Sequence, residues 1–304
     1  VSHFDTLKIE ELEKDKVHVS GCRGSSPPKD HKVCINLAGG FRNGMEIILT
    51  GLDIEEKAKV FTEVLFNSVG GQEQFDEVFI ELQRTDKENP TTNEQAMASL
   101  VISVKSSNQE LVGRLFSAKI IELALANIPG FFAESGPKSS GPVIIYWPAL
   151  VDSKYITEKV HIDGKEIEVV PTSQLDYEEI YYQREPISID DIEISDQKEI
   201  YFGDLFGTRS GDKGGCANLG VWAKNNLSYS FLYNFLTIEK LKELLPDLSE
   251  YKIERFELPN INSLNFYIHD ILEDGVSSNN RKDGQAKSLG AVSYTHLRAH
   301  ETDR

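Results

Sequence analysis

From Met45 to Trp147 the chain alternates segments of strand and helix character, and this order restricts the possible folds more than any other feature. Runs of β-forming or alternating residues predict strands over 33–37, 45–50, 75–82, 98–104 and 143–147. Gly39-Gly40 and Asn43-Gly44 are expected to form the turn that separates the first two of these strands. Apolar residues at helical spacing predict helices over about 53–68, with Asp53 as N-cap, and over about 108–127. From Met45 the order is β-α-β-β-α-β, typical of ferredoxin-like sandwiches, so the expected fold class is α+β.

The second half of the chain shows the same mixture of strands and helices. Strands are expected over 200–206, 217–223 and 251–258, and helices over 228–235 and 238–245. Thr237 is the expected N-cap of the second helix, and Asp283-Gly284 marks a final hairpin. The apolar run 264–272 fits either a strand or a helix. The two halves are therefore expected to be two α/β sandwich units.

The segment between the two halves is strongly acidic. A hairpin is expected over 156–170 around Asp163-Gly164, and 176–196 then carries eight acids against Arg184 alone, with strand tendency at 187–194. A solvated connector is favoured, and a carboxylate metal site is the alternative. The expected divisions are a first part (1–172), an acidic connector (173–197), a second domain (198–291) and a tail (292–304).

Both ends of the sequence are unusual. The start, VSHFDTLKIEEL, lacks an initiator Met and is expected to be the middle of a longer protein. The tail, VSYTHLRAHETDR, resembles translated sequencing-adapter read-through and is expected to be an artefact, with a real disordered terminus as the alternative.

Composition excludes several classes of function. The net charge of −17 and the isoelectric point of about 4.9 disfavour binding to nucleic acid and to anionic membranes, although a local cluster of cations can still bind a small anion. The three cysteines, Cys22, Cys34 and Cys216, are too few for a disulfide framework and favour a reducing compartment. We expect a cytoplasmic protein, or a mitochondrial one if a leader is missing.

The stretch Gly207 to Asn218 (GTRSGDKGGCAN) holds most of the candidate site residues. It is expected to be a loop between two strands, in which glycines allow the backbone to approach a ligand and Arg209 with Lys213 supplies positive charge. It does not match the nucleotide P-loop pattern. The alternative is a surface hairpin in which Asp212 and Lys213 pair with each other.

Other candidate sites have weaker support. The asparagines of 259–266, with His269 following, suit either orientation of a carbonyl group or ordinary Asx turns. His18, Cys22, His31 and Cys34 lie close in sequence, but their spacing matches no common zinc site. The sequence holds no G-x-S-x-G, H-E-x-x-H or strand-to-helix G-x-G-x-x-G motif, and no metal or other cofactor is expected.

Several motifs resemble the acyclic terpene utilisation (AtuA-like) family. They are RSGDKGGCANLGVWA from Arg209, FLTIEKLKELLP, LPNINSLNFYIHDIL, GSSPPKDHKVCINLAGGFRNGMEIILTGLD, LANIPGF and VIIYWPALV. The resemblance covers about Gly21 to Gly290, and implies a ferredoxin-like βαββαβ fold for 198–291. The first part resembles the later portion of the family's larger N-terminal domain, so an earlier segment is expected to precede it. Cys216 departs from the pattern, which leads us to expect a small polar or acidic residue there.

The resemblance implies breakdown of citronellol and geraniol through acyl-CoA thioesters. We therefore expect a protein that acts on or binds a branched acyl-CoA or related carboxylic acid in terpenoid or branched-chain catabolism. Asp212 and Lys213 are the expected catalytic residues, Asp212 as general acid or base; the expected substrate-binding residues are Arg209, Ser210, Gly211, Gly214 and Asn218. The alternative is a non-catalytic module that docks a partner such as an acyl-CoA carboxylase. Exposed sheet edges lead us to expect a homo-oligomer in either case.

Overall fold

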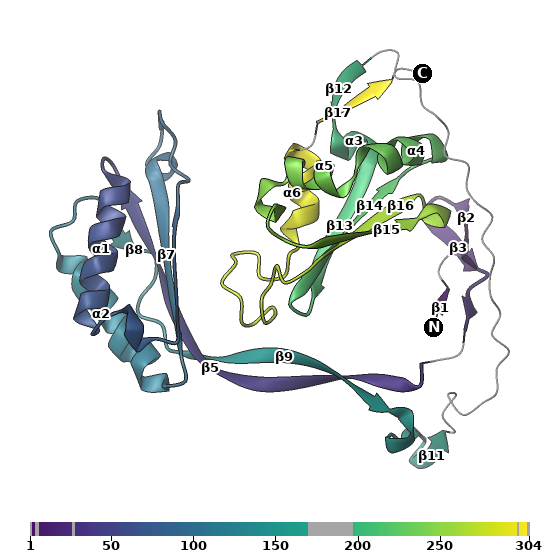
Figure 1. Ribbon diagram of the computed structural model, residues 1–304, viewed down its shortest axis with the longest axis horizontal. Coiled ribbons are helices and arrows are strands. Elements are labelled where there is room, and N and C mark those ends of the chain that lie inside the picture. The colour runs from purple at the N-terminus through teal and green to yellow at the C-terminus, as the bar shows by residue number, and fades with distance from the viewer. Residues whose placement is uncertain (1, 4–5, 26–27, 170–196, 297, 303–304) are drawn as a thin grey trace. The chain divides into compact units, whose positions relative to one another are not determined.

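The computed structural model describes all of the chain except residues 1, 4–5, 26–27, 170–196, 297 and 303–304 (Figure 1). It contains two compact units. One comprises the described residues of Val1–Ile35, Tyr146–Val276 and Asp283–Arg304, and the other comprises Asn36–Ile145 with Ser277–Lys282. Both units combine sheets with helices, so the α+β class is confirmed.

The unit built on Asn36–Ile145 has helices packed against one face of a sheet. Its strands are β5 (Asp30–Thr50), β6 (Glu77–Gln83), β7 (Met97–Ser106) and β8 (Phe131–Ala133), in the antiparallel order β6-β7-β5-β8. The helices are α1 (Ile54–Ser68), a π-helical turn (Leu111–Leu115), α2 (Phe116–Glu122) and a short 3₁₀ turn (Leu123–Leu125). Alternate residues of β5, such as Ile47 and Leu49, are fully buried with Phe61 of α1 and Phe116 of α2.

Three expectations for this unit were wrong. The glycines near Gly40 and Gly44 do not separate two strands, because β5 is continuous from Asp30 to Thr50. Gly40 has φ +87°, and a Cβ on Gly44 would lie 2.6 Å from the carbonyl oxygen of Ile102 on β7, so these glycines permit a local bend and close strand contact rather than turns. The expected helix 108–127 is interrupted because Gly113, with ψ −139°, leaves helical geometry.

The third wrong expectation for the unit built on Asn36–Ile145 concerns the strand that closes its sheet. The strand at the sheet end is β8, and the predicted strand 143–147 lies within β9 (Gly141–Asp152), which pairs with β5 outside the main strand order. Three residues of β8 carry too short a pattern to be recognised from sequence.

The second sheet is antiparallel and has helices packed against one face. Its strands are β13 (Phe206–Lys213), β14 (Cys216–Ala223), β15 (Ile253–Leu258) and β16 (Ser263–Ile268), in the order β13-β14-β16-β15. The helices are α4 (Asn226–Phe235), α5 (Ile238–Leu244) and α6 (Ser288–His296), on the same side of the sheet in Figure 1. Leu232, Leu241 and Leu289 from these helices share one buried core with Leu219 and Phe266 of the sheet.

Helix capping in this unit follows the sequence closely. Thr237 accepts a hydrogen bond from the backbone N–H of Lys240 at 3.1 Å, as predicted for the N-cap of α5. Asn225 caps α4 in the same way through the N–H of Ser228 at 2.8 Å. The apolar run from Leu264 is a strand, which ends at Ile268.

The order of elements here differs from the expected βαββαβ. The predicted strand 200–206 is divided into β12 (Gln197–Tyr201), the helical turn α3 (Phe202–Leu205) and the start of β13, so the four-stranded sheet begins with the hairpin β13-β14. The hairpin expected at Asp283-Gly284 is also wrong. The carboxylate of Asp283 instead accepts hydrogen bonds from the N–H groups of Lys287 and Ser288, at 2.9 and 2.6 Å, where α6 begins.

Smaller hairpins complete the described chain. The predicted hairpin at Asp163-Gly164 is present as β10 (Glu158–Ile162) and β11 (Lys165–Val169), and β2 (Lys8–Glu13) pairs with β3 (Lys16–Ser20). Ser2–His3 (β1) pairs with Arg23–Gly24 (β4), and Arg298–Thr302 (β17) pairs with β12. The acidic segment 176–196, with its predicted strand 187–194, lies outside the described residues. No helix within the described ranges is long and apolar enough to cross a membrane.

Candidate functional site

The stretch predicted as a glycine-rich loop is a tight β-hairpin. β13 continues through Lys213 and β14 starts at Cys216, so only Gly214 and Gly215 form the turn. Gly214 has φ +69°, which favours glycine, and a Cβ on Gly215 would collide with the carbonyl oxygen of Glu273. The N–H of Leu272 donates to the carbonyl of Gly215 at 2.8 Å and fixes this turn against the next loop.

Strand alternation divides the predicted site residues between the two faces of the sheet. Thr208, Ser210 and Asp212 point toward the helices, whereas Arg209, Gly211 and Lys213 lie on the opposite side. We call that opposite side the open face. Its described members on the four strands are Gly207, Arg209, Gly211, Lys213, Cys216, Asn218, Gly220, Trp222, Glu254, Phe256, Leu258, Ser263, Asn265 and Tyr267.

Ser210 and Asp212, on the helix side, contact the chain around the start of α6. The Ser210 hydroxyl donates to the carbonyl of Lys287 at 3.1 Å and accepts from the N–H of Gly290 at 2.9 Å. Thr208 donates to the carbonyl of Gly290 at 2.6 Å. The Asp212 carboxylate lies 3.9 Å from the Lys287 ammonium group. The structure therefore places both predicted residues in contacts that position α6.

Positive charge and amide groups lie together on the open face. Arg209 is exposed, and no described residue forms an ion pair with it. The Lys213 ammonium group donates to the backbone carbonyl of Asp212 at 2.9 Å, so its charge is not paired by that contact. The Asn218 amide donates to the Asn265 side-chain oxygen at 3.1 Å, which fixes the orientation of Asn218. Predicted residues Arg209, Lys213 and Asn218 are thus on one surface.

The glycines of β13 make room for neighbouring side chains. A Cβ on Gly211 would lie 3.0 Å from the Lys287 ammonium group, so a third cation reaches this strand, which the sequence reasoning missed. The Trp222 indole lies against Gly207, its cross-strand partner, where any Cβ would overlap the ring. Trp222 is 42% exposed and Phe256 is 47% exposed, so the open face presents aromatic as well as charged groups.

A group of titratable side chains lies at the end of the open face near the hairpin turn. Glu254 of β15 and His269, just after β16, are joined by a 2.6 Å contact between Oε1 and Nε2, and this hydrogen bond lowers the pKa of Glu254. The His269 ring packs edge-on against Tyr267, with ring centres 4.9 Å apart. A hydrogen bond with Cys216 is the main reason why the pKa of Tyr267 is raised to about 12. The sequence singled out His269 but missed this group, because the strand pairing that assembles it is long-range.

The two weaker candidates are not assembled into sites by the described residues. Pro259–Ile261 is a 3₁₀ turn, and Asn262, with φ 49°, ends it in the left-handed conformation that asparagine tolerates, just before β16. Cys22 and Cys34 are exposed and not in disulfides. Among the described residues no group of three or more His, Cys, Asp or Glu side chains could hold a metal ion.

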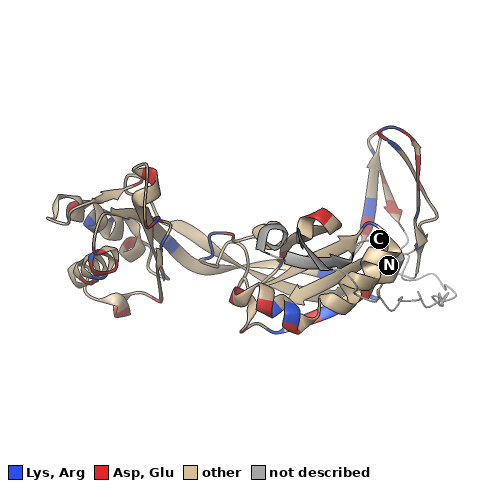
Figure 2. Cartoon of the chain, turned by 90° about the horizontal axis from the view of Figure 1, so that it is seen from above, with Lys and Arg blue, Asp and Glu red and all other residues tan. Residues whose placement is uncertain are grey.

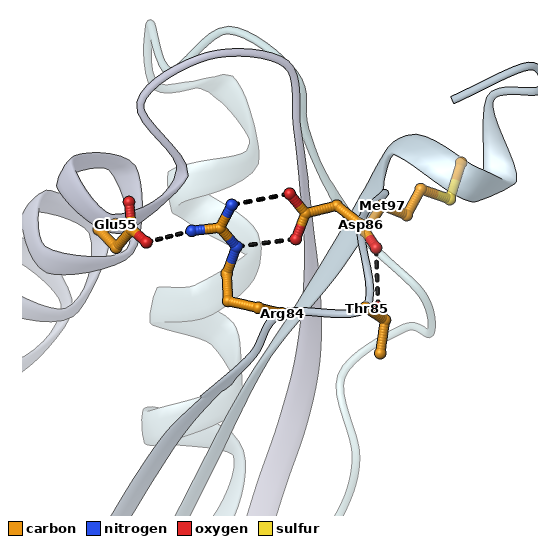
Figure 3. Close-up of polar contacts among 5 residues, drawn as sticks. All are labelled: Glu55, Arg84, Thr85, Asp86 and Met97. Atoms are coloured by element: carbon orange, nitrogen blue, oxygen red, sulfur yellow. Dashed lines mark hydrogen bonds and ion pairs between the residues drawn. The ribbon is translucent and has the colours of Figure 1, made fainter. Parts of the chain in front are cut away.

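A further polar cluster belongs to the unit built on Asn36–Ile145 (Figure 3). Arg84, after β6, binds both carboxylate oxygens of Asp86, at 2.7 and 2.8 Å, and also contacts Glu55 of α1. The hydrogen bond from Arg84 lowers the pKa of Asp86. Thr85 donates to the carbonyl of Met97 at 2.8 Å. Because the guanidinium is already occupied, the cluster fixes the loop between β6 and β7 rather than offering a free charge.

Charge elsewhere in the described chain is mixed. Figure 2 shows acidic and basic residues interspersed along the helices and strands. Arg114 is likewise exposed without an ion pair among the described residues, so Arg209 is distinguished by its neighbours Lys213 and Asn218 on the open face.

Comparison with protein families identifies the chain. A model of the acyclic terpene utilisation family protein AtuA matches residues 1–162, and a model of the AtuA ferredoxin-like domain matches residues 201–296. The chain belongs to the acyclic terpene utilisation family AtuA. The ferredoxin-like match includes all four strands of the sheet that carries the open face. No curated protein and no solved structure matches the chain.

Proposed function

We propose that this AtuA family chain binds the anionic group of a branched acyl-CoA or related carboxylic acid on the open face of its C-terminal sheet. Membership of the family gives the context, which is acyclic terpene utilisation. One observation supports the ligand class: Arg209 is exposed without an ion pair among the described residues, on the same face as Lys213 and Asn218. Such a group of donors suits a carboxylate or a phosphate.

Each residue has a distinct part in this proposal. Arg209 and Lys213 attract and bind the anion, while the fixed Asn218 amide orients a carbonyl oxygen. Gly211 leaves space for Lys287, and Gly214 allows the turn to lie against the Tyr146 ring. The exposed Trp222 ring offers an apolar surface to a branched chain. Ser210 positions α6. The prediction that Asp212 is a general acid or base requires a ligand that reaches its carboxylate around the hairpin tip.

Isothermal titration calorimetry with isovaleryl-CoA and with the free acid tests the proposal. Arg209→Ala and Lys213→Ala should each weaken binding roughly 10-fold to 100-fold, because a hydrogen bond to a charged group contributes about 1.5–3 kcal/mol. Lys240→Ala, on α5 across the sheet, is the matched control and should leave affinity unchanged. Equal affinity in all three variants would place the ligand elsewhere and refute the proposal.

The alternative function is non-catalytic docking of a partner such as an acyl-CoA carboxylase. The half-exposed Trp222 and Phe256 on the open face favour it, since aromatic residues are enriched at protein interfaces. A chain that elutes alone in size-exclusion chromatography with light scattering, and that turns over substrate unaided in a separate assay, counts against docking. The same measurement tests the predicted homo-oligomer. The cytoplasmic location remains a prediction from the cysteine count.

We also propose that the unit built on Asn36–Ile145 is a ferredoxin-like sandwich. Its sequence of elements, β5-α1-β6-β7-α2-β8, and its sheet order β6-β7-β5-β8 support this.

A further inference from the structure

Cys216 lies among groups that suit a reactive thiol, and no part of the binding proposal uses it. It is the first residue of β14, on the open face, opposite Lys213 in the strand register. In the neighbouring ladder between β14 and β16 the last pair is Ala217 with Ile268, and one further step along that register would place Cys216 opposite His269. Side chains at such positions have Cβ atoms about 5 Å apart. The register therefore puts the thiol and the imidazole on the same face, at the same end of the sheet.

The sulfur of Cys216 is contacted from two directions. The backbone N–H of Asp270 donates to Sγ at 3.5 Å. The Tyr267 phenol is the second group: a hydrogen bond with Cys216 is the main cause that raises its pKa to about 12, and the phenol, protonated at neutral pH as any tyrosine is, can donate to the sulfur. Two donors directed at one sulfur stabilise the negative charge that develops when the thiol proton leaves.

The imidazole of His269 is held by a third group. Oε1 of Glu254 lies 2.6 Å from Nε2 of His269, and the carboxylate accepts a hydrogen bond from that nitrogen. The other ring nitrogen, Nδ1, is therefore the one left for a proton transfer. The backbone N–H of His269 donates to the carbonyl of Lys252 at 3.0 Å, which fixes the residue against the neighbouring strand. Nucleophile, base and orienting carboxylate thus come from β14, from the residue that follows β16, and from β15, and these three strands are adjacent in one sheet.

We infer that Cys216 is a nucleophile that accepts the acyl group of a thioester. His269 takes the thiol proton while Sγ attacks the carbonyl carbon, and the bond from that carbon to the sulfur of CoA then breaks. The departing sulfur receives the proton from His269, so the products are an acyl-Cys216 thioester and free CoA thiol. Glu254 is a positioning residue that acts through His269. The choice of CoA as carrier rests on the proposed function, whereas the reactivity of the thiol does not.

The test uses a small acyl donor, so that it does not depend on CoA binding. The full chain is incubated with the isovaleryl thioester of N-acetylcysteamine, and the acylated cysteine is located by peptide mass spectrometry. Cys216 should be acylated at least ten times faster than Cys22 and Cys34, although those two are more exposed. Cys216→Ser should abolish this fast modification, and Cys22→Ser should not change it.

Positioning is tested in the same assay. His269→Gln and Glu254→Gln should each slow acylation of Cys216 at least tenfold, and Glu254→Asp should restore part of the rate, which a purely structural role for Glu254 would not produce. Acylation of all three cysteines at equal rates, or of Cys22 and Cys34 first, would overturn the inference. Failure of isovaleryl-CoA to bind, with fast acylation by the small donor retained, would refute the proposed function and leave the inference standing.

Discussion

Ser210→Ala separates a structural role from a ligand-binding role within the motif RSGDKGG. The hydroxyl of Ser210 makes two hydrogen bonds in a buried position, one to the carbonyl of Lys287 and one from the N–H of Gly290. Gly290 is the third residue of α6, in the first turn, where side-chain acceptors ordinarily cap the backbone N–H groups. Alanine would leave both backbone groups without this hydroxyl. Loss of such a cap costs about 1 kcal/mol, and the uncompensated carbonyl adds about as much, so we expect a destabilisation of about 2 kcal/mol.

That loss is large enough to measure. For a domain of about 100 residues, such as the ferredoxin-like domain matched over residues 201–296, a loss of about 2 kcal/mol corresponds to a fall in Tm of about 8–16 °C. Urea unfolding should give the free energy, and hydrogen exchange should show faster exchange at the Gly290 amide. Lys213→Ala is the matched control, because Lys213 is the exposed residue three positions further along the same strand and its loss should change stability by less than about 0.5 kcal/mol.

The two variants should have crossed effects. Ser210→Ala should lose stability and keep its affinity for isovaleryl-CoA, whereas Lys213→Ala should keep stability and lose affinity. A Ser210→Ala protein with unchanged stability and abolished binding would refute the assignment of Ser210 to the helix side.

Three further predictions follow from contacts described above. Because Arg84 lowers the pKa of Asp86, the stabilisation from this pair is present above the unfolded pKa of an aspartate and is lost as the pH falls through the lower folded value; urea unfolding between pH 7 and pH 2 should show this loss in the wild type and not in Asp86→Asn. Gly207→Val should displace the Trp222 ring, seen as a red shift of tryptophan emission, and an unchanged spectrum would contradict the packing. Arg42 donates to the carbonyl of Asn279 at 2.7 Å, so Arg42→Ala should accelerate hydrogen exchange over Ser277–Lys282 but not over β15.

Local signals in the sequence predicted most of the elements correctly. The helix from Ile54, the N-cap Thr237 and the hairpin at Asp163-Gly164 each depend on residues close together in the chain, and each is present. The glycines of β5 and β13 were misread, because a glycine needed for close contact with a distant strand or ring has the same letter as a glycine in a turn. The difference lies in residues such as Ile102 and Trp222, which only the folded chain brings near.

The candidate site shows the same limit. The motif predicted Arg209, Lys213 and Asn218 as site residues, and the structure places these three on one face. The structure places Ser210 and Asp212, which the motif also predicted, on the helix side of the sheet. In a strand, successive side chains point to opposite faces, but a loop has no such rule. Because the stretch was predicted to be a loop, the sequence could not indicate which of its residues lie on which face. Glu254, Tyr267 and Lys287 were missed because they reach the hairpin only through strand pairing and the chain that precedes α6.

The six residues Ser277–Lys282 are grouped with Asn36–Ile145 although the chain on either side of them belongs to the other unit. Asn280 donates to Glu77, Ser277 donates to the carbonyl of Ile144, and Lys282 contacts Gln83. A gene divided between the two matched regions would therefore give a first product that lacks a piece of its own structure. Fission or shuffling of these two regions during evolution would be opposed by that shared segment, and a clone of the first region alone would lack it.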